Sequence, residues 1–409
     1  MFQTNTDGYI SLVNKSRFFA LFLQPLMRQK FKFWKYSLFV VLQIVVIRNL
    51  YAVHETQGDT LSVAVPLSVG FNYQYGFTMN HNAAMAALNT KHFSTYELSL
   101  QRQTVGKSYW EYKCAYPAFG VTFMYSELAN PQYLGRMFGL YPYLDVSLFS
   151  WKRDKKIIFT VGLGLAYGTK PYDRFDNYKN ISYGSHLNVL ARFGLKGNVR
   201  IFPKTDINGG VNFTHVSNGT TKEPNFGLNT PTVFIGLSYQ INDASGERIV
   251  YKEETPSKYP YRLQIDTYGG YKNVSFMSGS PVYFVGELNV NLLKRYRFAR
   301  SWGAGFALSM DYAKMQILKD KGEFSGKAIS YMIPSVKAIH QFHINKLYIG
   351  TELCYMIYSK ENQKTNVYAN LTTGYYINEW LTAGLSLRAG FFFADYIGFG
   401  LGFKIWEIK

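Results

Sequence analysis

The feature that most constrains the fold is a period-two alternation of apolar residues, repeated along the chain after its first 52 residues. In 157–167 every second residue is apolar, and most residues between them are small, with Gly162 and Gly164 among them. The final segment, 397–405, repeats the pattern with glycine at three of the intervening positions. Such alternation is typical of β-strands, whose successive side chains point to opposite faces. No apolar run in this part of the chain approaches the roughly 20 residues that a membrane-spanning helix needs.

This alternation fits either a soluble β-sandwich or lipocalin-like barrel, or a transmembrane antiparallel β-barrel. Residues 53–409 would have to form two or more soluble domains of the first kind. The second face of the strands is small and rich in glycine, so it cannot supply the charge of a soluble surface. Aromatic residues make up 18% of the chain, and many lie near predicted strand ends, as interfacial girdles require. We therefore expect an all-β transmembrane barrel.

Sixteen strands can be placed in the sequence, among them 109–126 and 302–316. An even number returns both ends of the barrel to the periplasmic side. The polar connector 243–259 divides the strands into eight and eight. This leaves two arrangements open, either a single barrel of about sixteen strands or two β modules.

The expected domain organisation follows from that connector. Residues 1–52 form an N-terminal extension and signal peptide, and residues 53–245 form the first eight-stranded barrel region. Residues 246–259 form a periplasmic linker, and residues 260–409 form a C-terminal region of eight further strands.

The first 52 residues have the pattern of a targeting segment. Four basic residues between 28 and 35 precede the apolar stretch 37–47, and a cleavage site follows at Ala52. Met27 is a plausible start, because residues 27–52 form a complete signal peptide. Removing residues 1–52, with seven Lys/Arg and one Asp, lowers the formal net charge from +18 to +12. A positive secreted chain suits anionic lipid head groups, and without clustered basic helices nucleic acid is not an expected partner.

Two cysteines, Cys114 and Cys354, lie far apart in the sequence. They form neither a disulfide framework nor the spacing of a zinc site, although one disulfide between them stays possible.

The candidate site lies in the strand that ends near Ser217. His215 and Ser217 are two positions apart, so in a strand they share a face, with Cβ atoms about 7 Å apart. An imidazole can span that gap, which would place a base beside a nucleophile. In a membrane barrel Val211 would face lipid on the same side, whereas Asn212 would face the lumen. A site on the lipid side would serve a lipid substrate.

At this motif the sequence resembles the PagL-type lipid A 3-O-deacylases, outer-membrane hydrolases that remove an ester-linked acyl chain from lipid A. The resemblance covers about residues 65–242, and upstream stretches at 162–167 and 170–173 are similar to longer members described as acyloxyacyl hydrolases. The residues that carry it are His215-Val-Ser217-Asn218-Gly219 and Pro224-Asn225-Phe226-Gly227.

The resemblance implies roles for individual residues. Ser217 would be the nucleophile and His215 its general base, while Asn225 would bind the oxyanion with backbone amides near Asn218 and Gly219. Small members of the family carry a Glu two residues after the final glycine, where this chain has Asn229. An amide can accept a hydrogen bond from the histidine but cannot stabilise an imidazolium as a charge does. Glu223 is the nearest acid in sequence, and we expect it to face solvent.

The resemblance therefore implies a serine esterase of the Gram-negative outer membrane. It would hydrolyse an ester-linked acyl chain of lipid A in lipopolysaccharide, with no metal and no cofactor, and it makes no prediction of oligomeric state. The alternative is a non-catalytic outer-membrane channel or structural barrel with a degenerate site, since sixteen strands would enclose an aqueous lumen. A channel has no use for polar groups that face lipid, where they cost free energy. We therefore favour the enzyme.

Overall fold

The computed structural model describes most of the chain after the expected signal peptide. The described ranges are 63–80, 83–86, 88–151, 155–251, 261–274, 281–360, 366–390 and 394–408. The expected signal peptide at 1–52 lies outside them, as do residues 252–259 of the expected linker. Those two boundaries stay predictions.

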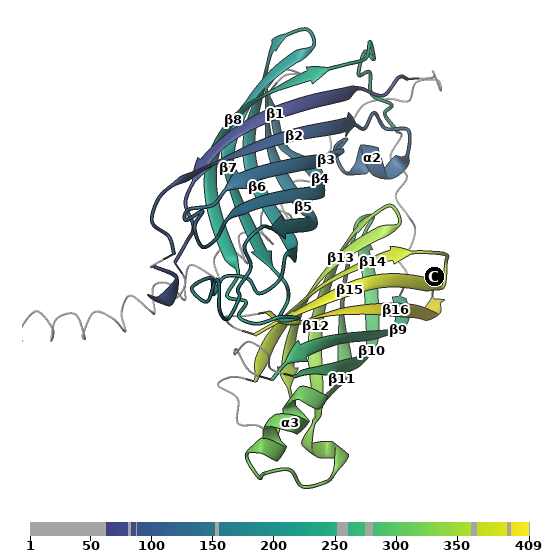
Figure 1. Ribbon diagram of the computed structural model, residues 1–409. Coiled ribbons are helices and arrows are strands. Elements are labelled where there is room, and N and C mark those ends of the chain that lie inside the picture. Colours follow the sequence, from purple (N-terminus) through teal and green to yellow (C-terminus); the bar gives the residue numbers. More distant parts are fainter. Residues whose placement is uncertain are drawn as a thin grey trace, which may run out of the picture. The chain divides into compact units, whose positions relative to one another are not determined.

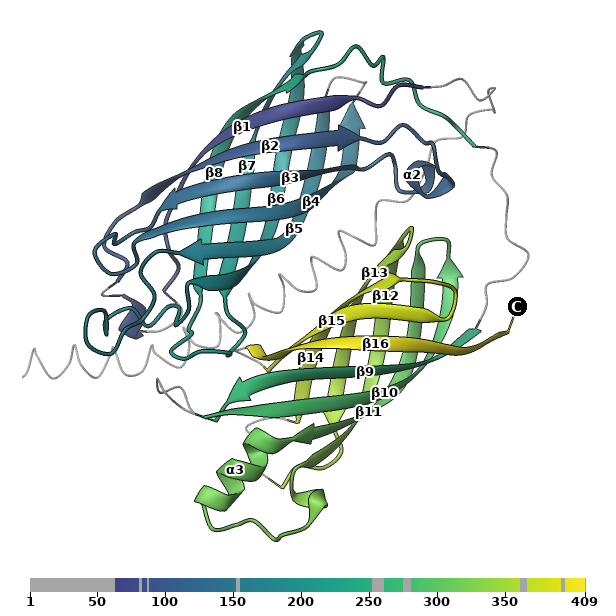
Figure 2. The same ribbon diagram turned by 45° about the vertical axis from the view of Figure 1, so that its right-hand side comes forward.

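The strands close into two antiparallel barrels of eight (Figure 1), which confirms the all-β prediction. Of the two arrangements left open, a single sixteen-stranded barrel is wrong and two β modules are observed. The first barrel closes where β1 pairs with β8, and the second where β9 pairs with β16 (Figure 2). The first comprises β1 (Leu67–Gly76), β2 (Phe93–Gln103), β3 (Ala118–Glu127), β4 (Arg136–Trp151), β5 (Lys155–Gly168), β6 (Leu187–Phe202), β7 (Thr205–Ser217) and β8 (Leu228–Gln240). The second comprises β9 (Tyr261–Asn273), β10 (Val282–Arg297), β11 (Arg300–Asp311), β12 (Met332–Ile344), β13 (Leu347–Met356), β14 (Val367–Tyr376), β15 (Leu381–Ala389) and β16 (Ala394–Ile408).

Two predicted strands are partly wrong because helices replace their ends. Within 109–126, the helix α2 (Tyr109–Lys113) precedes β3, and Glu111 Oε2 accepts the backbone N–H groups of Gly106 and Lys107 at 2.9 Å. Within 302–316, β11 ends at Asp311, whose carboxylate accepts the backbone N–H of Lys314 at 3.0 Å. That hydrogen bond caps the helix α3 (Tyr312–Asp320).

The remaining helical segments are short, and both cysteines are free. The two 3-10 turns are η1 (Ala83–Met85) and η2 (Ala328–Ser330). Within the described ranges, no helix has the length and apolar character needed to cross a membrane. Cys114 and Cys354 are both buried and unbridged.

The first barrel has an apolar outer face and a polar interior. On β7 the side chain of Val211 is 52% exposed, whereas Asn212 and Thr214 are buried. Inside, Arg192 Nη2 lies 2.7 Å from Glu97 Oε1, and both side chains are only 3% exposed. The Tyr141 hydroxyl donates to the same carboxylate oxygen at 2.7 Å. An eight-stranded barrel is just wide enough for its side chains, so these residues fill the interior.

The second barrel is filled in the same way. Lys337 Nζ lies 3.0 Å from Glu352 Oε2 and donates to Asn289 Oδ1 at 2.8 Å. Arg388 pairs with Glu287, and all of these side chains are buried. Removing one partner of such a pair leaves a buried charge and costs about 3–5 kcal/mol, so a single substitution in either pair should destabilise its barrel.

Candidate active site

The strand β7 places the candidate base and nucleophile together on the outer face of the first barrel. Thr214 and Val216 point inward and are buried, so the alternating residues His215 and Ser217 point outward. His215 Nε2 lies 2.9 Å from Ser217 Oγ. Ser217 is 9% exposed at the end of the strand. The structure thus brings the two residues into hydrogen-bond contact.

Asn229 lies directly opposite His215 on the neighbouring strand β8. Its Oδ1 is 2.7 Å from His215 Nδ1. A carboxamide oxygen can only accept, so this contact places the imidazole hydrogen on Nδ1. The lone pair of Nε2 then faces the hydroxyl of Ser217. This is the tautomer that a general base requires.

The loop between β7 and β8 turns sharply after Ser217 and returns to pack against the histidine. Gly219 and Thr220 have φ angles of +62° and +65°, and Gly227 has +77°. A Cβ atom on Gly227 would lie 2.9 Å from His215 Cε1. A glycine at 227 therefore satisfies both the backbone conformation and the close approach to the imidazole.

The predicted oxyanion-binding residues have different surroundings. The backbone N–H of Asn218 donates to Asn225 Oδ1 at 3.1 Å, and Asn218 Nδ2 donates to Lys222 O at 2.7 Å. Both groups of Asn218 that can donate are thus engaged within the protein. In the part of the chain that the structure describes, no hydrogen bond is made by Asn225 Nδ2 or by the backbone N–H of Gly219. Gly219 is buried and Asn225 is partly exposed, and both are candidates to donate to a ligand.

A second loop, 169–186, supports the first. The backbone N–H groups of Phe226 and Gly227 donate to Ile181 O at 3.1 Å and Ser182 O at 2.7 Å. Asn218 Nδ2 also donates to Ser185 Oγ at 3.0 Å. Sequence reasoning missed this support, because contacts made by backbone amides leave no pattern of residue types.

Glu223 does not face solvent as expected, and that expectation is wrong. Its side chain is 4% exposed. Burial raises the pKa of its carboxyl group, although the backbone N–H of Asn225 opposes the shift. Among the described residues its Oε2 has no hydrogen-bond partner. Glu223 is therefore a buried acid within the loop that follows the dyad.

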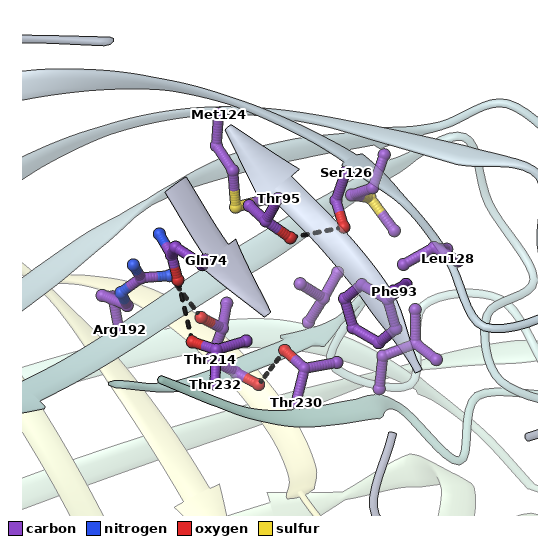
Figure 3. A pocket seen from close by; sticks show the side chains of 13 residues that line it. Gln74, Phe93, Thr95, Met124, Ser126, Leu128, Arg192, Thr214, Thr230 and Thr232 are labelled. Carbon is purple, nitrogen blue, oxygen red and sulfur yellow. Dashed lines mark hydrogen bonds between the residues drawn. The ribbon is translucent and has the colours of Figure 1, made fainter. Parts of the chain in front are cut away.

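A small cavity of about 20 Å³ lies inside the barrel behind the dyad (Figure 3). Thr214 and Val216 line it, and Gln74 accepts a hydrogen bond from Thr232 at 2.8 Å on another side. Its volume suffices for about one water molecule. Because His215 and Ser217 point away from it, the cavity is not where a substrate would meet them.

The second barrel contains another Ser–His contact. His343 Nε2 lies 2.9 Å from Ser301 Oγ, and both side chains are buried in the barrel interior. A pair enclosed in this way cannot meet a bulky substrate. Over the described ranges, no cluster of three or more His, Cys, Asp or Glu side chains is arranged to hold a metal ion.

Comparison with known proteins adds two family matches. Residues 94–238 match the lipid A 3-O-deacylase family (PagL), and residues 261–407 match the acyloxyacyl hydrolase C-terminal domain. No curated protein matches the sequence significantly.

Solved structures are only distantly similar. Neisserial surface protein A (NspA) matches with a TM-score of 0.31 and 9% identity, over 43% of this chain and 97% of its own. A mutant of the Rh. blastica porin matches with a TM-score of 0.17 and 8% identity, over 84% of this chain and 100% of the porin chain. These scores are too low to support a functional argument.

Proposed function

We propose that this chain, which belongs to the PagL family of lipid A 3-O-deacylases, is a serine esterase that hydrolyses an ester-linked acyl chain of lipid A. The observation that carries the proposal is the hydrogen-bonded series Asn229–His215–Ser217 on the apolar outer face of the first barrel. An aliphatic ester embedded in a leaflet could reach this face without leaving the lipid. The family match supports a lipid A substrate.

His215 acts as the general base in this proposal. Its Nε2 takes the proton of Ser217 as Oγ attacks the ester carbonyl, and Asn229 holds Nδ1–H. The imidazolium then gives its proton to the departing sugar hydroxyl. Water, deprotonated by His215, releases the fatty acid from Ser217 in the second half of the reaction. All proton transfers use one histidine, and no step calls for a metal or cofactor.

Asn225 and Gly219 are the proposed oxyanion donors. The Asn225 side chain is oriented by its acceptor contact with the Asn218 amide, which leaves Nδ2 to donate. A preorganised donor of this kind is worth about 10²–10³ in kcat. Asn218 itself then serves to position the loop rather than to bind substrate.

The proposed location is the outer membrane of a Gram-negative cell. An outward apolar band and a polar interior suit a barrel in lipid, and Ser217 lies at the end of β7 that carries the longer loop. If the short turn at 203–204 is periplasmic, Ser217 lies at the level of the outer leaflet, where lipid A is found. The substrate and the nucleophile would then share one leaflet.

The alternative of a channel loses its main support. It depended on a wide barrel of sixteen strands, whereas each closed barrel has eight. The buried Arg192–Glu97 pair also lies across the interior of the first barrel. The remaining alternative is a purely structural role, in which the chain would hydrolyse no ester in the experiment described next.

Mass spectrometry of lipid A tests the proposal. Cells that produce the wild-type chain should lose one ester-linked acyl chain from lipid A, and cells that produce Ser217→Ala should not. Ser217→Ala should still show the heat-dependent gel shift of a folded barrel. EDTA should leave hydrolysis of a soluble model ester unchanged. A folded wild type that leaves both lipid A and model esters intact would contradict the proposal.

A further inference from the structure

The loop between β7 and β8 buries one carboxyl group, that of Glu223, which the proposed mechanism does not use. Its side chain is 4% exposed. Burying a carboxyl group costs free energy unless hydrogen bonds replace the lost water. One of its oxygens, Oε2, has no hydrogen-bond partner among the described residues. An exposed acid would avoid this cost, so the buried position of Glu223 indicates a specific contact.

Glu223 is not the acid that orients the histidine of the dyad. Both ring nitrogens of His215 are already engaged, Nδ1 with Asn229 Oδ1 at 2.7 Å and Nε2 with Ser217 Oγ at 2.9 Å. A neutral imidazole has one donor nitrogen and one acceptor nitrogen, so these two contacts use its full capacity. The contact that explains Glu223 therefore lies in another part of the site.

The backbone N–H of Asn225 donates a hydrogen bond to the carboxyl group of Glu223, which precedes it in the loop. Because Oε2 has no partner, Oε1 is the accepting oxygen. The side chain of Asn225 is held as well, since its Oδ1 accepts the backbone N–H of Asn218 at 3.1 Å. Asn225 is thus fixed at its main chain and at its side chain. These two hydrogen bonds leave its Nδ2 to donate to the proposed oxyanion.

The main chain on either side of Glu223 packs closely against its surroundings. A Cβ atom on Gly184, in the second loop, would lie 2.5 Å from the carbonyl oxygen of Lys222 and 3.1 Å from that of Pro224. A larger side chain than glycine therefore has no space at position 184. Lys222 O also accepts Asn218 Nδ2 at 2.7 Å. These contacts fix the position from which the carboxyl group of Glu223 reaches the amide.

We propose that Glu223 is a positioning residue, whose carboxyl group holds the main chain of Asn225 so that Nδ2 donates to the oxyanion of the ester that Ser217 attacks. This assignment rests on the proposed function and deepens it by naming what supports an oxyanion donor. Such a donor is effective when it is oriented before the reaction, because no energy is then spent on moving it. The role requires an acceptor oxygen at position 223 and does not require a charge.

The test measures release of fatty acid from lipid A by the full chain in detergent micelles. Glu223→Leu keeps most of the buried volume but removes the acceptor, and it should lower kcat by roughly ten- to a hundredfold through misplacement of Asn225. Removing the donor itself with Asn225→Ala should lower kcat by about 10²–10³. KM should change little, because the oxyanion forms only in the transition state. Glu223→Gln retains an acceptor oxygen and should keep kcat near the wild-type value.

A double-mutant cycle separates this role from general support of the loop. If Glu223 acts through Asn225, adding Glu223→Leu to Asn225→Ala should lower kcat no further. Additive losses would overturn the assignment, as would an unchanged kcat in Glu223→Leu or an equal loss in Glu223→Gln. Glu127→Leu is the matched control, since it removes an exposed acid from the end of β3, which runs in the same direction as β7. It should leave kcat unchanged.

Hydrogen exchange of the Asn225 amide is a second readout, and it needs no turnover. In chains whose heat-dependent gel shift shows a folded barrel, exchange should be faster in Glu223→Leu and Glu223→Ala than in wild type, and at least as slow as wild type in Glu223→Gln. Unchanged exchange in the Leu and Ala variants would overturn the assignment. A wild-type chain without esterase activity would contradict the proposed function and this assignment with it, whereas additive losses in an active chain would contradict the assignment alone.

Discussion

Replacing Asn229 by Asp should make the proposed esterase faster. The change is isosteric, so the carboxylate can occupy the place of the amide, 2.7 Å from His215 Nδ1. A neutral amide only accepts a hydrogen bond, whereas a carboxylate also stabilises the imidazolium that forms when Ser217 attacks. An amide can also rotate by 180° and donate to Nδ1, which favours the unproductive tautomer. A carboxylate cannot.

The size of the effect follows from the two kinds of hydrogen bond. A hydrogen bond to a charged group contributes about 1.5–3 kcal/mol, against about 0.5–1.5 kcal/mol for a neutral one. The difference of roughly 1–2 kcal/mol corresponds to an increase of about five- to thirtyfold in kcat. In serine proteases the change from acid to amide lowers kcat by about 10⁴, mainly because the histidine adopts the wrong tautomer. This factor is the upper limit for the increase in kcat expected of Asn229→Asp. Asn229→Ala should instead lower kcat by at least about tenfold.

The assay is release of fatty acid from lipid A by purified protein in detergent micelles, with folding verified by gel shift. Asn198→Asp, on β6 toward the opposite end of the same barrel, adds the same charge and should leave kcat unchanged. A folded Asn229→Asp variant that is slower than wild type would refute the role given to charge. An Asn229→Ala variant with wild-type kcat would show that Asn229 does not orient His215.

Three further predictions concern the loop and the two barrels. Gly227→Ala should lower kcat by tenfold or more without unfolding the barrel, because the new Cβ would lie 2.9 Å from His215 Cε1. Gly246→Ala is the control in the same assay: Gly246 has a comparable φ, but a Cβ there would have its nearest neighbour 3.6 Å away, so kcat should be unchanged. Burial raises the pKa of the Glu223 carboxyl group above 4.5, so the folded loop holds this proton more tightly than the unfolded loop. The stability of the loop should therefore fall as pH rises from 4.5 through the folded pKa, and hydrogen-exchange protection of residues 218–227 measures this fall. Glu223→Gln should abolish the fall, and a pH dependence that is the same in this variant would contradict the prediction. Residues 53–245 alone should fold in detergent and show a heat-dependent gel shift, since β1 pairs with β8 and leaves no open edge; aggregation of this fragment would show that the barrels need each other.

The sequence predicts those parts of the fold and site that depend on local pattern. The two-residue spacing of His215 and Ser217 suffices to place them on one face, because period two is a property of every strand. Asn229 lies farther along the chain, but a hairpin register brings it opposite His215. The catalytic roles themselves stay predictions until the variants are measured.

Other features depend on contacts that the pattern does not encode. One barrel of sixteen strands and two of eight have the same alternation, and they differ only in whether β8 closes onto β1 or pairs onward. Ile181 and Ser182 support the loop between β7 and β8 through their backbone carbonyls, and any residue could supply those carbonyls. The polar sequence around Glu223 predicts exposure to solvent, whereas tertiary packing buries this side chain.

The filled interior of the first barrel bears on where the proposed esterase would obtain its water. Release of an acyl group from Ser217 would consume one water molecule, and the buried ion pair of Arg192 and Glu97 occupies the interior behind the strand that carries Ser217. Under the proposed function, this water would reach Ser217 from the outer face of the barrel, toward which His215 and Ser217 point.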